Sequence, residues 1–173
     1  MFRSKLIALF LALMTVVGLT ACRTKIPSPA EIVGKLTENE PSLPMGKTYY
    51  SDAVKDSGEH LSAELLHSAY GIPEDFDGII SAAVYLSSFG FPCEFAVFYC
   101  KSRAAAEDVA LFCRERIDTV TQNAPEASSF GSVKLEDYLS YLKNSAVIIS
   151  GRIVALIISA DEASARRALY KAI

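Results

Sequence analysis

Residues 79–87, IISAAVYLS, and 93–100, CEFAVFYC, are two apolar runs rich in β-branched and aromatic side chains. The turn-forming segment SFGFP, residues 88–92, separates them, so the stretch predicts a β-hairpin. Ser102 then caps a long helix that ends near residue 122, because apolar side chains recur there at helical spacing. The whole stretch predicts a hairpin followed by a helix that packs on it.

The same order returns near the C-terminus. Residues 146–149 and 153–158 are apolar and flank the tight turn Ser150-Gly151-Arg152, which predicts a second hairpin. The segment Ser159-Ala160-Asp161-Glu162 matches a capping box and predicts a final helix that runs to Ile173. The chain is therefore expected to be an α+β protein with an antiparallel four-stranded sheet built from two β-hairpin–helix units.

The two units also resemble each other in sequence. Residues 94–114 align without gaps with residues 152–172, which leaves duplication and chance as alternatives. Between the units, residues 123–134 predict a loop and residues 135–142 predict one or two helical turns.

Additional helices are expected before the first hairpin. Ser28-Pro29-Ala30-Glu31 forms a capping box with proline at the first helical position, and apolar residues continue at helical spacing to Leu36. A second helix is predicted over residues 59–70, where Gly71 ends it. Residues 39–56 predict an irregular connection between the two helices.

The first 21 residues form a targeting segment. Arg3 and Lys5 precede an apolar run at 6–17, which is shorter than the roughly 20 residues of a membrane span and typical of a signal peptide. Leu19-Thr20-Ala21-Cys22 resembles a bacterial lipobox, so cleavage is expected between Ala21 and Cys22. An accidental cysteine after a plain secretory signal and an uncleaved anchor are the alternatives.

Cys22 is the expected point of lipid attachment. Its thiol would carry a diacylglyceryl group, and acyl chains such as palmitate would hold the protein on the outer face of the cell membrane. Residues 22–29 form the lipidated tether, and an extended chain over 23–29 spans at most about 25 Å. Residues 30–173 are then expected to form a single α+β domain.

Composition limits the classes of partner. The 173 residues are 51% apolar and 21% charged, which excludes a disordered polymer and a polytopic membrane protein. The 17 basic residues are outnumbered by 20 acidic ones and form no basic block. The charge balance therefore argues against a nucleic-acid partner.

With the lipobox, four features occur in a familiar order: Tyr70-Gly71-Ile72, the strand at 94–98 with its long helix, Asn144 to Ile148, and Gly151 to Val154. This combination resembles a family of small lipoproteins found mainly in Gram-positive anaerobes, the domain of unknown function 4358. The resemblance implies the location and the type of domain, and it supplies no catalytic residue.

The candidate metal and catalytic groups are few. His60, Glu64 and His67 would share one helix face and are the ligand types of a zinc or iron site, but a solvated helix side is the default interpretation. Residues 74–78, Glu-Asp-Phe-Asp-Gly, lack the ligand spacing of a calcium loop. No Gly-x-Ser-x-Gly or nucleotide-binding glycine pattern occurs, so no catalytic site, metal or cofactor is assigned.

The leading hypothesis is a membrane-anchored extracytoplasmic domain without catalysis that binds an envelope protein or a small ligand. The tyrosines Tyr49, Tyr50, Tyr138 and Tyr141 would line a binding surface, or else pack half-buried. An envelope hydrolase or metal-dependent enzyme is the alternative, and a chaperone-like or inhibitory subunit is a third.

The three cysteines after the anchor are expected to stay reduced. Cys93 and Cys100 lie on one strand, about 23 Å apart at 3.3 Å per residue. Cys113, on the returning helix, lies short of Cys93 and past Cys100, whereas a disulfide needs Cα atoms within about 7 Å. All three are predicted to be buried thiols that pack as small apolar residues.

Lipid attachment at Cys22 is directly testable. The Cys22→Ala variant should lose metabolic labelling by radioactive palmitate and should appear as an uncleaved or soluble product on a gel of membrane fractions. Unchanged lipid labelling in this variant would contradict the lipobox.

Overall fold

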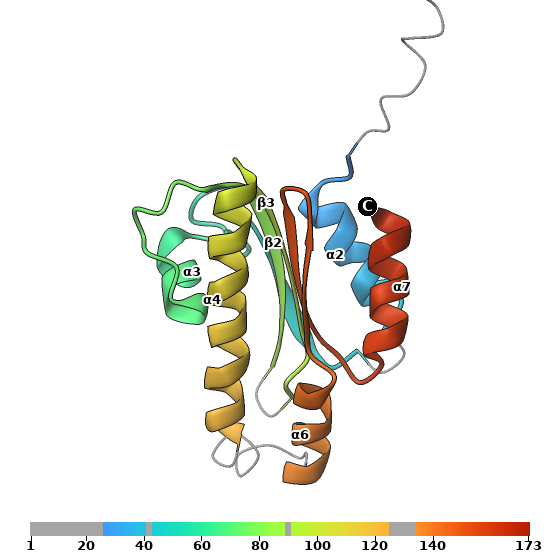
Figure 1. The fold of residues 1–173 in the computed structure, drawn as a ribbon. Coiled ribbons are helices and arrows are strands. Elements are labelled where there is room, and N and C mark those ends of the chain that lie inside the picture. The colour runs from blue at the N-terminus through green and yellow to red at the C-terminus, as the bar shows by residue number, and fades with distance from the viewer. Residues whose placement is uncertain (1–25, 41–42, 89–90, 125–133) are drawn as a thin grey trace, which may run out of the picture.

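A computed structural model describes residues 26–40, 43–88, 91–124 and 134–173. Its sheet has five strands in the order β1-β2-β3-β5-β4, and every neighbouring pair is antiparallel (Figure 1). The strands are β1 (Gly46–Tyr50), β2 (Ile79–Ser87), β3 (Glu94–Cys100), β4 (Ala146–Ser150) and β5 (Ile153–Ile158). The α+β class is confirmed, and the sheet has one strand more than the predicted four.

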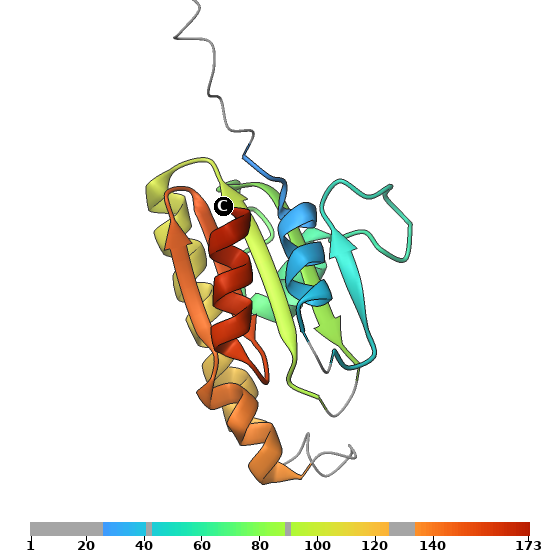
Figure 2. The same cartoon turned by 90° about the vertical axis from the view of Figure 1, so that its right-hand side faces the viewer.

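Helices cover both faces of this sheet. On one face lie α3 (Ala63–Tyr70) and α4 (Arg103–Gln122), and on the other lie α2 (Pro29–Glu38) and α7 (Glu162–Ala172) (Figures 1 and 2). The short helix α6 (Leu135–Lys143) lies at the end of the molecule where α4 finishes (Figure 1). No helix within the described ranges is long and apolar enough to cross a bilayer.

The central strands β3 and β5 are buried on both faces. Along β3, Phe98 faces α4 and Phe95 faces α2, because successive side chains point to opposite sides of a strand. Each of these rings is fully buried and contributes about 1.5–3 kcal/mol of hydrophobic stabilisation. Phe98 also meets Tyr70 edge to face, with ring centroids 5.6 Å apart. The sheet thus separates two apolar cores.

Both predicted hairpins and the long helix are confirmed. β2 pairs with β3 and β4 pairs with β5, and Ser102 caps α4 through its side chain. The capping box at Ser28 is present, with both of its reciprocal hydrogen bonds. Gly71 ends α3 with φ of 68°, a left-handed conformation that glycine adopts without a steric penalty.

Three local expectations are wrong. β1 lies inside 39–56, where an irregular connection was expected, because its strand character comes from pairing with the distant β2. α3 begins at Ala63 rather than at 59, since Ser62 is the residue that caps it. The final helix begins at Glu162 with Asp161 as its cap, so the capping box expected at Ser159 does not form.

The two hairpin–helix units are not arranged as copies. Antiparallel neighbours such as β3 and β5 share a twofold axis normal to the sheet, which would place the following helices on one face. Instead α4 packs with Phe98 and Leu156, whereas α7 packs with Phe95 and Ile157 on the opposite face. This arrangement does not support duplication of one unit.

The described cysteines are free and buried, as the sequence predicts. Cys93 lies in the core beside α2 and α7, whereas Cys100 and Cys113 lie in the core beside α4. Burial raises the pKa of the Cys100 thiol to about 11. Burial, with Glu40 and Glu94 nearby, raises the pKa of Cys93 to about 12, and burial also raises the pKa of Cys113.

These raised pKa values predict inert thiols. At pH 8 the thiolate fraction at a pKa of about 11 is on the order of one in a thousand, so iodoacetamide should leave Cys93, Cys100 and Cys113 unmodified in the native chain. Denaturation in guanidinium should make all three react, as peptide mass spectrometry would show. Fast labelling of the native chain, or a disulfide-linked peptide, would contradict the arrangement.

Candidate functional site

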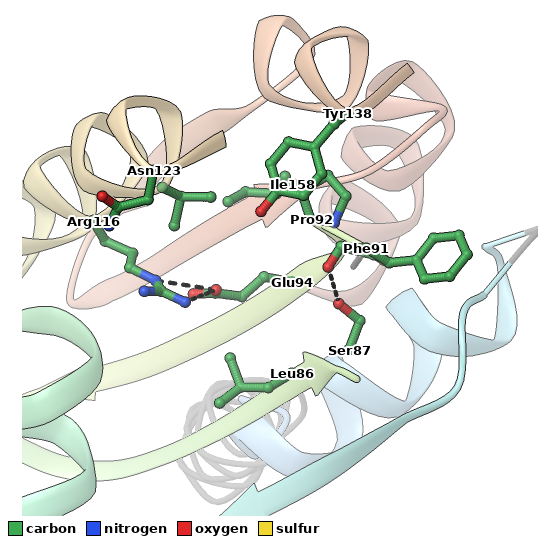
Figure 3. A pocket seen from close by; sticks show the side chains of 11 residues that line it. Leu86, Ser87, Phe91, Pro92, Glu94, Arg116, Asn123, Tyr138 and Ile158 are labelled. Carbon is green, nitrogen blue, oxygen red and sulfur yellow. Dashed lines mark hydrogen bonds and ion pairs between the residues drawn. The ribbon is translucent and has the colours of Figure 1, made fainter. Parts of the chain in front are cut away.

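A cavity of about 290 Å³ lies between β2, β3, the C-terminal half of α4 and the helix α6 (Figure 3). Its apolar wall includes Leu86, Pro92, Val120 and Ile158, and its polar groups are Ser87, Glu94, Arg116, Asn123 and Tyr138. The chain enters α2 at the opposite end of the domain (Figure 1). Arg116 lies roughly 20 Å along α4 from that end, at 1.5 Å per helical residue.

The polar groups reach the cavity because their elements end there. Glu94 is the first residue of β3, and its side chain points to the α4 side of the sheet. On α4, Arg116 follows Val109 and Cys113 at helical spacing, so it belongs to the helix face that packs on the sheet. A cation is therefore directed toward the buried start of β3.

Glu94 and Arg116 form a buried ion pair. Arg116 donates to Glu94 Oε2 from Nη2 at 3.0 Å and from Nε at 3.2 Å. The hydroxyl of Tyr70 donates to the other oxygen, Oε1, at 2.7 Å. The side chain of Glu94 is 6% exposed and that of Arg116 is 24% exposed. Both carboxylate oxygens are thus satisfied, which a buried charge requires.

The protonation states follow from this network. Burial first, and then the Glu94 carboxylate, hold the pKa of Tyr70 well above its usual value. Burial also raises the pKa of Tyr138, which Arg116 partly counteracts. Burial disfavours the charged form of Arg116, but the Glu94 carboxylate favours that form more strongly. The pKa of Arg116 is therefore raised above its usual value. At neutral pH the cavity offers neutral hydroxyls beside a charge-balanced pair, which suits hydrogen bonding.

A second buried carboxylate lies at the same end of the sheet. Ser159 donates to Glu40 Oε2 at 2.5 Å, and Glu40 is 7% exposed. Its Oε1 has no hydrogen-bond partner among the described residues. The charge of Glu40 contributes to the raised pKa of Cys93 and, after burial and Cys93, to that of Tyr141. Glu40 is therefore a buried acid without a cationic partner in the described part of the chain.

The histidines of the candidate metal site do not share a helix face. His60 precedes α3, and its Nδ1 lies 3.1 Å from the carbonyl of Ala53. His67 is in α3, with Nδ1 3.2 Å from the carbonyl of Ile72. The described residues contain no group of three histidines, cysteines or acids that could hold a metal ion. The prediction that His60, Glu64 and His67 share one helix face is wrong, because the helix begins after His60.

The other candidate residues are placed as follows. Tyr138 lines the cavity, whereas Tyr49, Tyr50 and Tyr141 are half-buried against the cores. In the acidic turn, Asp77 pairs with Lys101 at 2.9 Å. Ala21 and Cys22, the expected cleavage and lipid-attachment residues, lie outside the described residues.

Glu94, Arg116 and Tyr70 are site residues that were not predicted from the sequence. A signal was present, because an acid at the start of an apolar strand and an arginine on the apolar face of a helix are both unusual in a core. Neither residue indicates its partner, since 22 residues separate Glu94 from Arg116 along the chain.

Comparisons with family models, curated proteins and solved structures give no match to this chain. The resemblance to the lipoprotein family therefore stays a prediction.

The Glu94–Arg116 pair predicts a coupled loss of stability. Glu94→Gln and Arg116→Met should each lower the free energy of unfolding by about 3 kcal/mol, because each leaves one buried partner unpaired. The double variant should lose at least 1 kcal/mol less than the sum of the two single losses, as urea unfolding of the full chain would measure.

The exposed pair of Arg103 and Glu107 supplies the matched control. Glu107→Gln removes the same charge from a pair whose side chains are 83% and 58% exposed, so its effect should stay below about 0.5 kcal/mol. Additive losses at Glu94 and Arg116 would show that the two residues are not coupled.

Proposed function

We propose that this chain is a membrane-anchored extracytoplasmic lipoprotein whose domain binds a small polar ligand in the cavity beside Glu94 and Arg116. The lipobox at Cys22 supports the anchor, and the family resemblance agrees with it. The proposal for the ligand depends mainly on one observation, the cavity that combines an apolar wall with converging polar groups.

The position of the cavity favours a soluble ligand over a lipid. The chain enters the domain at the end opposite α6, so a short tether from Cys22 would direct that end to the bilayer (Figure 1). The cavity would then open away from the headgroups, toward the extracytoplasmic space. Ligands that diffuse there are water-soluble.

The size and chemistry of the cavity narrow the ligand class. A volume of about 290 Å³ is at the small end of the range for ligand pockets, which suits one sugar or amino-acid unit. The Tyr138 hydroxyl and the Asn123 amide can donate and accept hydrogen bonds, while Glu94 already balances the charge of Arg116. A neutral or zwitterionic ligand with several hydroxyl or amide groups fits these groups best.

A thermal-shift screen of the full chain in detergent tests this proposal. A panel of monosaccharides, amino acids and dipeptides should contain a compound that raises Tm by about 5 °C or more at saturation. Tyr138→Phe and Asn123→Ala should weaken its binding at least tenfold, whereas Tyr49→Phe, which does not line the cavity, should not.

Two results would contradict the proposal. Binding that is equally strong in the cavity variants would place the ligand elsewhere. Conversion of the bound compound to product would favour the envelope enzyme, and the product would show its reaction class.

A further inference from the structure

A second concave site lies on the opposite face of the sheet, between α2 and α7. This groove of about 300 Å³ is lined by Lys35, Asn39, Ser164, Arg167, Ala168 and Lys171. The two helices pack through Ile32, Leu36 and Leu169 into one core, so the backbone that carries the groove is held in place. Ala168 is the single apolar residue of the lining, and its short side chain leaves the space open.

The groove has a marked excess of positive charge. Its charged lining residues are the cations Lys35, Arg167 and Lys171, and the lining contains no acid. No ion pair among the described residues uses any of these three cations. The neighbouring Arg166, by contrast, pairs with Glu162. In a chain with more acids than bases, these three cations share one groove and have no carboxylate partner among the described residues.

The arrangement has an energetic cost. Arg167 and Lys171 are one helical turn apart, where like charges destabilise a helix. Lys35 adds a third positive charge from the other helix. An anion between the helices would relieve this repulsion and convert it into attraction.

We propose that the α2–α7 groove binds a phosphate-bearing anion. A guanidinium fork can bond two phosphate oxygens, and two ammonium groups can neutralise the remaining charge. The Ser164 hydroxyl offers a further donor, while the Asn39 side-chain amide already donates to the carbonyl of Lys35. This site is separate from the cavity, which lies on the α4 side of the sheet.

The phosphate could belong to a free compound or to a lipid headgroup. Lys171 lies in the last turn of α7, whose C-terminal end is beside the start of α2 (Figure 2). The groove therefore runs from Asn39 and Ser164, where α2 ends and α7 begins, to Lys171, near the end of the domain where α2 begins. Both sources present the same chemistry to the three cations.

Lysine acetylation of the full chain, read by mass spectrometry, distinguishes the sources. In zwitterionic detergent, pyrophosphate should slow acetylation of Lys35 and Lys171 at least fivefold at matched ionic strength, if the anion is free. In nanodiscs, phosphatidylglycerol should give this protection relative to phosphatidylcholine, if the anion is a lipid. Lys47, Lys55 and Lys134 are exposed lysines outside the groove and serve as internal controls.

An arginine variant supplies the specificity control. Arg167→Gln should raise at least tenfold the concentration of pyrophosphate or phosphatidylglycerol that gives half of the maximal protection of Lys35 and Lys171. Arg114→Gln removes the same charge from an exposed position on α4 and should leave that concentration unchanged. Equal protection of the control lysines, equal effects of the two variants, or no protection from either phosphate would overturn the proposal.

Discussion

The burial of β3 and β5 on both faces is the constraint on which the rest of this structure depends. A strand with apolar side chains on both of its faces cannot expose either face to water. Helices must therefore cover both faces of the sheet. α3 and α4 cover one side, and α2 and α7 cover the other. The cavity lies at one end of the first helix layer, and the basic groove lies within the second.

The ion pair of Glu94 and Arg116 interrupts this apolar pattern at one place. Because Glu94 begins β3, its charge lies where the sheet ends and α4 and α6 leave a space. Tyr70 completes the network from α3, so two helices, α3 and α4, hold the one carboxylate that β3 carries. Such a network fixes the positions of polar groups around a cavity and still leaves Tyr138 and Asn123 available to a ligand.

The two proposed sites lie in different parts of the molecule. The cavity lies on the α4 side of the sheet, at the end remote from the chain entry, and the groove lies on the opposite face between the second half of α2 and α7 (Figures 1 and 2). If Cys22 carries the lipid, the first site lies at the end of the domain remote from the bilayer, and the second lies on the side of the domain, with Lys171 at its bilayer end. One domain could then bind a soluble ligand in the cavity and a phosphate group in the groove.

The sequence by itself determined the local elements, because their causes act within a few residues. Apolar runs rich in β-branched and aromatic side chains, separated by turn residues, predict the hairpins. Caps at Ser28, Ser102 and Gly71 begin or end helices through bonds within one turn. Tertiary structure alone decided the edge strand β1, the opposite faces of α4 and α7, and the Glu94–Arg116–Tyr70 network. These features depend on contacts between distant parts of the chain. Such contacts form because they bury apolar surface in the assembled cores, and local propensity does not encode them.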